Sequence, residues 1–178
     1  MNLIWISMGA LGGLFFLFIK GKHALKPKDM RSADASEKSE TTQDRVEQAL
    51  ASGDVEAMAS ALKVTDEPVL RDALLGQIVA IYYRQRSETE GREAFYRYAG
   101  QHIDEISAVL NVLERSDEGR PVRVESFKML AIAMGEDKRY DEAIEVCKTA
   151  LSLGLENGTK TGFEGRIARL EKKRDVES

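Results

Sequence analysis

Residues 127–155 read FKMLAIAMGEDKRYDEAIEVCKTALSLGL, and this stretch decides the fold of the 178-residue chain. Apolar residues and alanines recur in it at steps of three and four, which is helical spacing. A charged turn at 136–139 separates two such runs, so the sequence predicts two antiparallel helices. The residues expected to pack between these helices are Phe127, Leu130, Ala131, Tyr140, Ala143 and Ala150.

This pattern resembles the tetratricopeptide repeat. The first helix carries a large residue, a leucine three positions later and then a small residue, and the second opens with Tyr140-Asp141-Glu142-Ala143. Lys138-Arg139 stands where the family usually has glycine and aspartate, and Gly154-Leu155 stands in place of its usual proline. The resemblance covers about 30 residues, one repeat length. It implies a protein-interaction scaffold.

The rest of the chain from residue 42 onward shows helical periodicity and no strand alternation. Asp54 and Thr65-Asp66 are typical starts of helices, and Gly100 predicts a break before a further helix at 103–113. The last helices are expected near 121–135, 140–153 and 161–174, the last of them as a cap. Residues 42–178 are therefore expected to form an all-α domain, a stack of antiparallel helical hairpins.

An apolar run without charged side chains extends from Leu3 to Ile19. At 1.5 Å per residue it spans about 26 Å, close to the thickness of a hydrocarbon core. Residues 1–22 are therefore expected to form a single transmembrane anchor with a basic flank. A cleaved signal peptide and a buried core helix are the alternatives, although no small-residue cleavage site follows the run.

The basic residues near this run all follow it, and they indicate its orientation. They are Lys20, Lys22, Lys26, Lys28 and Arg31. The positive-inside rule then predicts a C-terminal domain in the cytoplasm, beside a bacterial inner membrane. A periplasmic domain or a mitochondrial location is left open. Gly9 and Gly13 have the spacing of close helix contacts in membranes, which leaves open a weak homodimer.

The segment 23–41 is expected to be a flexible linker, because 29–41 is polar and contains one large apolar residue, Met30. Residues 1–40 hold six Lys and Arg against four Asp and Glu, whereas the whole chain has a net charge of −4. The main domain is therefore acidic. An acidic domain argues against nucleic-acid binding, which requires a basic face.

No group of residues forms a recognisable catalytic or cofactor motif. The single Cys147 and two distant histidines exclude the common zinc patterns, and His102 is expected at the surface near the break. The segment 158–162 is interpreted as a loop before a threonine-capped helix, not as a phosphate site. We therefore expect no enzyme, no cofactor and no metal site.

An aromatic cluster lies at 82–98. Tyr82 and Tyr98 extend the apolar stripes of their helices and are expected in the core, while Tyr83 and Tyr96 lie off the stripes and are candidates for partner binding. The acidic turn residues Glu136 and Asp141 are the alternative binding positions.

The sequence thus predicts a membrane-anchored adaptor that binds a membrane-associated protein partner at the cytoplasmic face. A permanent subunit of a larger membrane complex is the alternative. Both are consistent with an anchor that raises local concentration near a membrane assembly.

Overall fold

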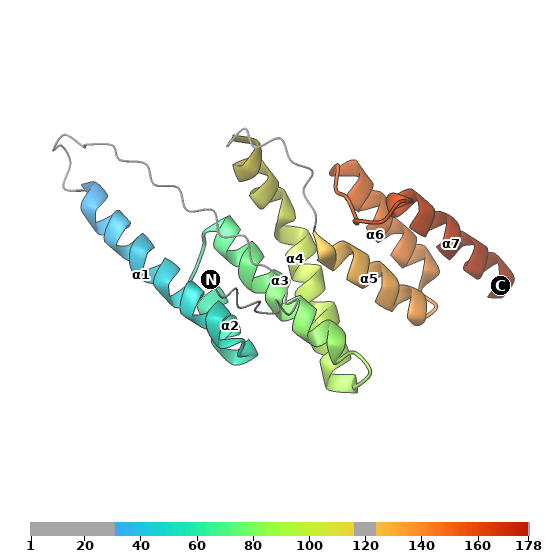
Figure 1. The fold of residues 1–178 in the computed structure, drawn as a ribbon, viewed down its shortest axis with the longest axis horizontal. Helices are drawn as coiled ribbons and strands as arrows, with labels where there is room; N and C mark the ends of the chain where they lie inside the picture. The colour runs from blue at the N-terminus through green and yellow to red at the C-terminus, as the bar shows by residue number, and fades with distance from the viewer. Residues whose placement is uncertain (1–30, 116–123, 178) are drawn as a thin grey trace, which may run out of the picture.

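The computed structural model describes residues 31–115 and 124–177, and the side chains of 42–112 and 124–177. These ranges contain helices and no strand, so the prediction of an all-α fold is confirmed. Figure 1 shows the helices following one another from α1 at one end to α7 at the other. They are α1 (Arg31–Ser52), α2 (Val55–Leu62), α3 (Pro68–Arg84), α4 (Thr89–Arg115), α5 (Glu125–Glu136), α6 (Tyr140–Ser152) and α7 (Gly162–Glu177).

The predicted membrane anchor, residues 3–19, lies outside the described residues, as do Gly9 and Gly13. Within the described ranges, no helix combines the length and the apolar character needed to cross a bilayer.

The predicted flexible linker 23–41 differs from the structure over its second part, because α1 already begins at Arg31. The physical reason is that 31–41 contains alanine, glutamate, lysine and arginine, which favour helices even where they bury nothing. The segment can therefore extend a helix whose other end packs in the core, where Val46 is fully buried. The polar composition of 31–41 indicates that the segment contributes little to the core, but it is compatible with a helix.

Local polar contacts fix the starts of α2 and α3. Asp54 caps α2 as predicted, and its carboxylate accepts a hydrogen bond of 3.1 Å from the Glu56 amide. The start of α3 differs in detail, because its cap is Glu67, whose carboxylate accepts from the Leu70 amide at 2.8 Å. Pro68 follows in the first turn, where a missing N–H costs nothing.

The predicted break at Gly100 is wrong, because α4 runs unbroken from Thr89 to Arg115. A glycine inside a helix costs only about 1 kcal/mol relative to alanine. Burial on both sides of it outweighs this cost, since Ala99 is fully buried and Ile106 is 1% exposed.

Two apolar clusters form the core of the stack. One lies among α1, α2 and α3, and the other among α3 to α7. Tyr82 and Tyr98 contact both clusters, and their rings stack with centroids 5.8 Å apart. These two tyrosines, which the sequence places in the core, therefore join the clusters into one continuous interior.

Candidate interaction surface

The α5–α6 hairpin is built around its tight turn. All six residues expected to pack between these helices are buried. In the turn, Lys138 has φ of +61°, the left-handed region that favours glycine. The Arg139 amide closes the turn by donating to the Met134 carbonyl at 2.9 Å. The unusual backbone thus lies where the resembling family usually has glycine.

Helix α7 packs on α6 and approaches α5 at one point. Its inward residues are Phe163, which is 1% exposed, and Leu170, which is 7% exposed. A Cβ atom added to Gly135 of α5 would lie 3.0 Å from a Leu170 methyl group. The missing side chain at Gly135 therefore allows α5 and α7 to come close.

A cavity of about 240 Å³ opens between α5 and α7, and we call it the α5–α7 groove. Apart from Glu136, its lining is apolar on the α5 side, and it is mainly cationic on the α7 side. Three cations and Leu170 are spaced i, i+3, i+4 and i+7, so one face of α7 carries them. The lining residues are Ala131, Ile132, Gly135, Glu136, Arg166, Arg169, Leu170 and Lys173.

The charges of this groove are unbalanced. Among the described residues, Arg166, Arg169 and Lys173 form no ion pair. The Nε atom of Arg166 is buried without a hydrogen-bond partner. The one carboxylate in the lining, Glu136, is already bound by the Arg86 guanidinium through two hydrogen bonds of 3.0 and 2.9 Å. Lys138 is the main partner of Glu177, and Lys173 adds a smaller electrostatic contribution that lowers the pKa of this carboxylate, while Arg169 donates a 3.4 Å hydrogen bond to Thr161. The groove therefore presents positive charge that neighbouring residues offset only in part.

The thiol of Cys147 lies beneath this region in α6 and is fully buried. Burial raises its pKa to about 11, although the nearby Arg166 and Arg169 guanidinium groups partly oppose the shift. Cys147 is therefore a neutral core residue, as its inward repeat position suggests.

Of the four residues that the sequence nominates for partner binding, Tyr83, Tyr96 and Glu136 lie close together in the structure. Tyr83 packs against Phe95 with ring centroids 5.5 Å apart, and the Arg86 guanidinium lies over the Tyr83 ring, 4.0 Å from its centroid. Glu136 binds the same Arg86. The fourth nominee, Asp141, instead pairs with Arg174 of α7 at 2.8 Å.

Tyr96 is also held by intramolecular contacts. Its hydroxyl donates to the Asp137 carboxylate at 2.6 Å, and Arg92 Nε donates to the same carboxylate at 3.1 Å. Burial alone would raise the pKa of Asp137, but these hydrogen bonds lower it below its ordinary value. Burial and the Asp137 contact raise the pKa of Tyr96 to about 12. Partner binding by the four nominated residues stays a prediction, and each of them already has a contact within the chain.

His102 is not at the surface, contrary to expectation. It is 4% exposed and bridges three helices, with Nδ1 2.7 Å from Ser126 Oγ and Nε2 2.8 Å from an Asp72 oxygen. The signal was available in the sequence, because Ala99 and Ile106 place position 102 on the buried face of one continuous helix. Serine, histidine and aspartate meet here, and Ser126 is buried, with 2% of its surface exposed.

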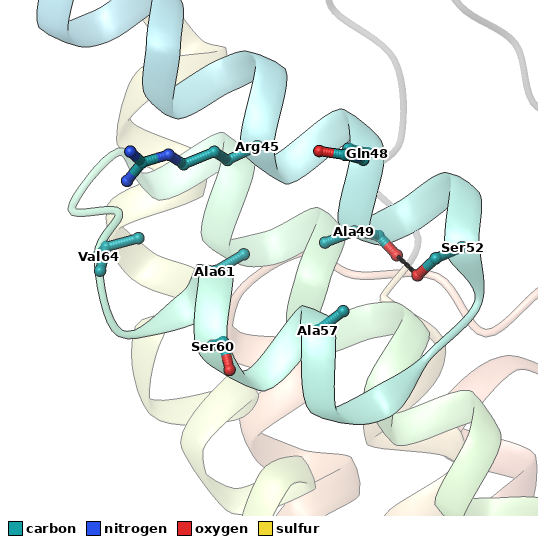
Figure 2. A pocket seen from close by; sticks show the side chains of 8 residues that line it. All are labelled: Arg45, Gln48, Ala49, Ser52, Ala57, Ser60, Ala61 and Val64. Atoms are coloured by element: carbon teal, nitrogen blue, oxygen red, sulfur yellow. Dashed lines mark hydrogen bonds between the residues drawn. The ribbon is translucent and has the colours of Figure 1, made fainter.

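A second hollow of about 430 Å³ lies between α1 and α2 (Figure 2). Small side chains line most of it, among them Ala49, Ala57 and Ala61, and Ser52 donates to the Ala49 carbonyl at 2.7 Å. Arg45 is its only cation. The hollow has no charge pattern that would select a partner.

The loop 158–162 is a closed turn. Asn157 Oδ1 accepts from the Thr159 amide at 2.9 Å and from the Thr159 hydroxyl at 2.7 Å. Thr161 crowds Gly165, where an added Cβ would lie 2.3 Å from the threonine Cβ. The carboxylate of Glu164 lies beside Gly162 at the start of α7, where a bound anion would have to sit. No group of His, Cys, Asp and Glu among the described residues could hold a metal ion.

Comparisons of the chain with protein-family models, with curated proteins and with solved structures find no match.

Proposed function

We propose that this protein is a membrane-tethered, tetratricopeptide-repeat-like adaptor whose helical domain binds a protein partner. The α5–α6 hairpin carries the proposal. Its six packing positions are buried, and its turn residue Lys138 has the backbone conformation of a glycine. Hairpins of this kind stack side by side and leave open grooves that suit extended protein segments.

The tether in this proposal is the apolar run 3–19, followed by its basic flank. Tethering restricts the domain to a thin layer beside the membrane, which raises its effective concentration toward partners there. The positive-inside rule places this layer in the cytoplasm.

Deletion of residues 1–28 tests the tether. The full chain should sediment with membranes and dissolve only in detergent, whereas the shortened chain should be soluble and equally helical by circular dichroism. A shortened chain that stays with membranes without aggregating would contradict the single anchor. Reporter domains fused to the C-terminus, active only in the cytoplasm or only after export, test the orientation.

The stoichiometry of the isolated complex separates an adaptor from a permanent subunit. The intact chain is purified in mild detergent after crosslinking in the cell and, separately, without crosslinking. An adaptor should lose its partner on dilution when it is not crosslinked, because exchangeable interfaces have measurable dissociation rates. Fixed stoichiometry after extensive dilution would instead indicate a permanent subunit.

A further inference from the structure

Several arginines of the described residues have a carboxylate partner on another helix or turn. Arg71 binds Glu105 with two hydrogen bonds of 2.7 Å and also donates to the Leu62 and Thr65 carbonyls. The pairs Arg86–Glu136 and Arg92–Asp137 join the α3–α4 hairpin to the end of α5. Arg166, Arg169 and Lys173 have no ion pair among the described residues, and they differ from other such cations because all three line one cavity.

We propose that the α5–α7 groove binds an acidic, extended segment of a protein partner. Carboxylates of the segment would pair with Arg166, Arg169 and Lys173, while an apolar side chain rests on Ile132 and Leu170. This inference rests on the proposed function, namely that the domain binds a protein, and it names the chemistry of that partner.

The first argument is the charge of the groove. Arg166, Arg169 and Lys173 have no ion pair among the described residues, and a carboxylate is the strongest acceptor for a guanidinium group. The carboxylate in the lining, Glu136, is bound by Arg86. Carboxylates of an acidic segment would therefore give these cations the ion-pair partners that the described residues do not supply.

The second argument is the spacing of the charges. From Arg169 to Lys173 the helix rises about 6 Å, close to the roughly 7 Å between alternate residues of an extended chain. A segment with acidic residues at alternate positions would thus place two carboxylates beside Arg169 and Lys173. Its intervening side chains would point away from α7, toward the apolar lining contributed by α5.

The third argument favours a protein over a lipid surface. The groove is walled by two helices, so a ligand must enter it as a narrow strand or a small headgroup. It also lies at the end of the stack opposite α1, the helix nearest in sequence to the predicted anchor (Figure 1). A membrane surface is therefore treated as an outcome of the test.

The test uses the full chain in neutral detergent and a fluorescently labelled peptide of alternating glutamate and leucine. The matched peptide has glutamine at every glutamate position. Fluorescence anisotropy should show binding of the acidic peptide that weakens with salt, and binding of the glutamine peptide at least roughly tenfold weaker, because charge-assisted pairs are lost.

Neighbouring lysines of α7 provide a matched pair of variants. Lys173 lines the groove, whereas Lys172 is exposed and does not line it. Lys173→Glu should weaken binding at least roughly tenfold, and Lys172→Glu, which makes the same charge change, should alter it less than about twofold. Equal effects of the two substitutions would overturn the proposal, since they would show nonspecific attraction.

Arg166→Lys is a second groove variant that keeps the charge and removes the planar guanidinium group, which can bind a carboxylate through two hydrogen bonds. Arg166→Lys should also weaken peptide binding. It replaces Lys173→Glu as the test variant if Lys173→Glu lowers the melting temperature. Displacement of the acidic peptide by a water-soluble lipid headgroup, glycerophosphoglycerol, at lower concentrations than unlabelled peptide requires would overturn the proposal in favour of a lipid surface. Self-association that depends on Lys173, measured by light scattering, would overturn it in favour of a second copy.

The same variants separate this inference from the proposed function. If the crosslinked cellular partner is recovered equally with wild-type and Lys173→Glu chains, the adaptor function stands and the groove assignment fails. If the wild-type chain recovers no partner at all while the acidic peptide still binds the groove, the adaptor function fails instead.

Discussion

The hydroxyl of Tyr96 on α4 donates a 2.6 Å hydrogen bond to the Asp137 carboxylate, which follows the end of α5. This bond joins two parts of the chain that are 41 residues apart. The same carboxylate also forms an ion pair with Arg92, so Asp137 contacts two residues of α4. The relationship makes Tyr96 a structural residue whatever its role in binding.

Tyr96→Phe should destabilise the fold by about 1–2 kcal/mol, because it removes a hydrogen bond to a charged group in a partly buried site. The free energy of unfolding, measured by urea titration, checks this value. Tyr83→Phe is the control, because its ring contacts with Phe95 and Arg86 need no hydroxyl. Equal stability of Tyr96→Phe and wild type would mean that water replaces the bond without cost.

His102→Ala should destabilise the fold by about 2–4 kcal/mol, since it opens a cavity and leaves the Ser126 hydroxyl without its partner. Ser107→Ala on the exposed side of α4 is the matched control and should stay within roughly 0.5 kcal/mol. A similar small effect for both variants would contradict the bridging role of His102.

The sequence predicts helices well where their apolar spacing is regular. Helix α6 is expected at 140–153 and is observed at Tyr140–Ser152, because Ala143, Cys147 and Ala150 repeat at steps of three and four. Small and apolar residues at this spacing indicate a buried helix face by themselves. The helix can therefore be predicted without knowing which helix packs against it.

The sequence is a poorer guide where tertiary contacts outweigh local preference. Gly100 is a helix breaker by propensity, but its neighbours Ala99 and His102 are buried against other helices and keep α4 continuous. The α5–α7 groove was missed for a related reason. Arg166 and Lys173 have the spacing of an ordinary solvated face, and only the position of α5 makes that face one wall of a cavity.

Acid should weaken the contacts between the α3–α4 hairpin and α5. Burial raises the pKa of Asp137, but hydrogen bonds from Tyr96 and Arg92 lower it below its ordinary value. The Arg86 hydrogen bond likewise lowers the pKa of Glu136 against the effect of burial. A lowered folded pKa means that the stabilisation is present above the unfolded values of 4.5 and 3.8 and is lost as pH falls through the folded values.

The difference in unfolding free energy between wild type and Arg92→Gln should therefore be largest near neutral pH and shrink below about pH 4. Arg84→Gln is the control, because Arg84 is exposed and has no ion pair among the described residues. A difference for Arg92→Gln that stays constant down to the acid transition would contradict the linkage.

Ala143→Leu should destabilise the fold by about 1–3 kcal/mol, because extra methylene groups would enter a fully buried position at the α5–α6 contact. Ala168→Leu makes the same change on an exposed position of α7 and should have little effect. Thermal unfolding followed by circular dichroism compares the two. Equal melting temperatures would show that α5 and α6 can separate to admit the larger side chain.

Lys138→Gly should stabilise the protein by about 0.5–1 kcal/mol, because it relieves the left-handed backbone at φ of +61°. The ion pair that it removes, between Lys138 Nζ and Glu177 at 3.0 Å, is exposed and contributes little. Lys138→Ala loses the same pair but keeps the strain, so it should be no more stable than wild type. Urea titration of the two variants, with Glu177→Gln to isolate the ion pair, measures the strain. If glycine and alanine give equal stability, the turn relaxes in solution and the left-handed conformation is not required there.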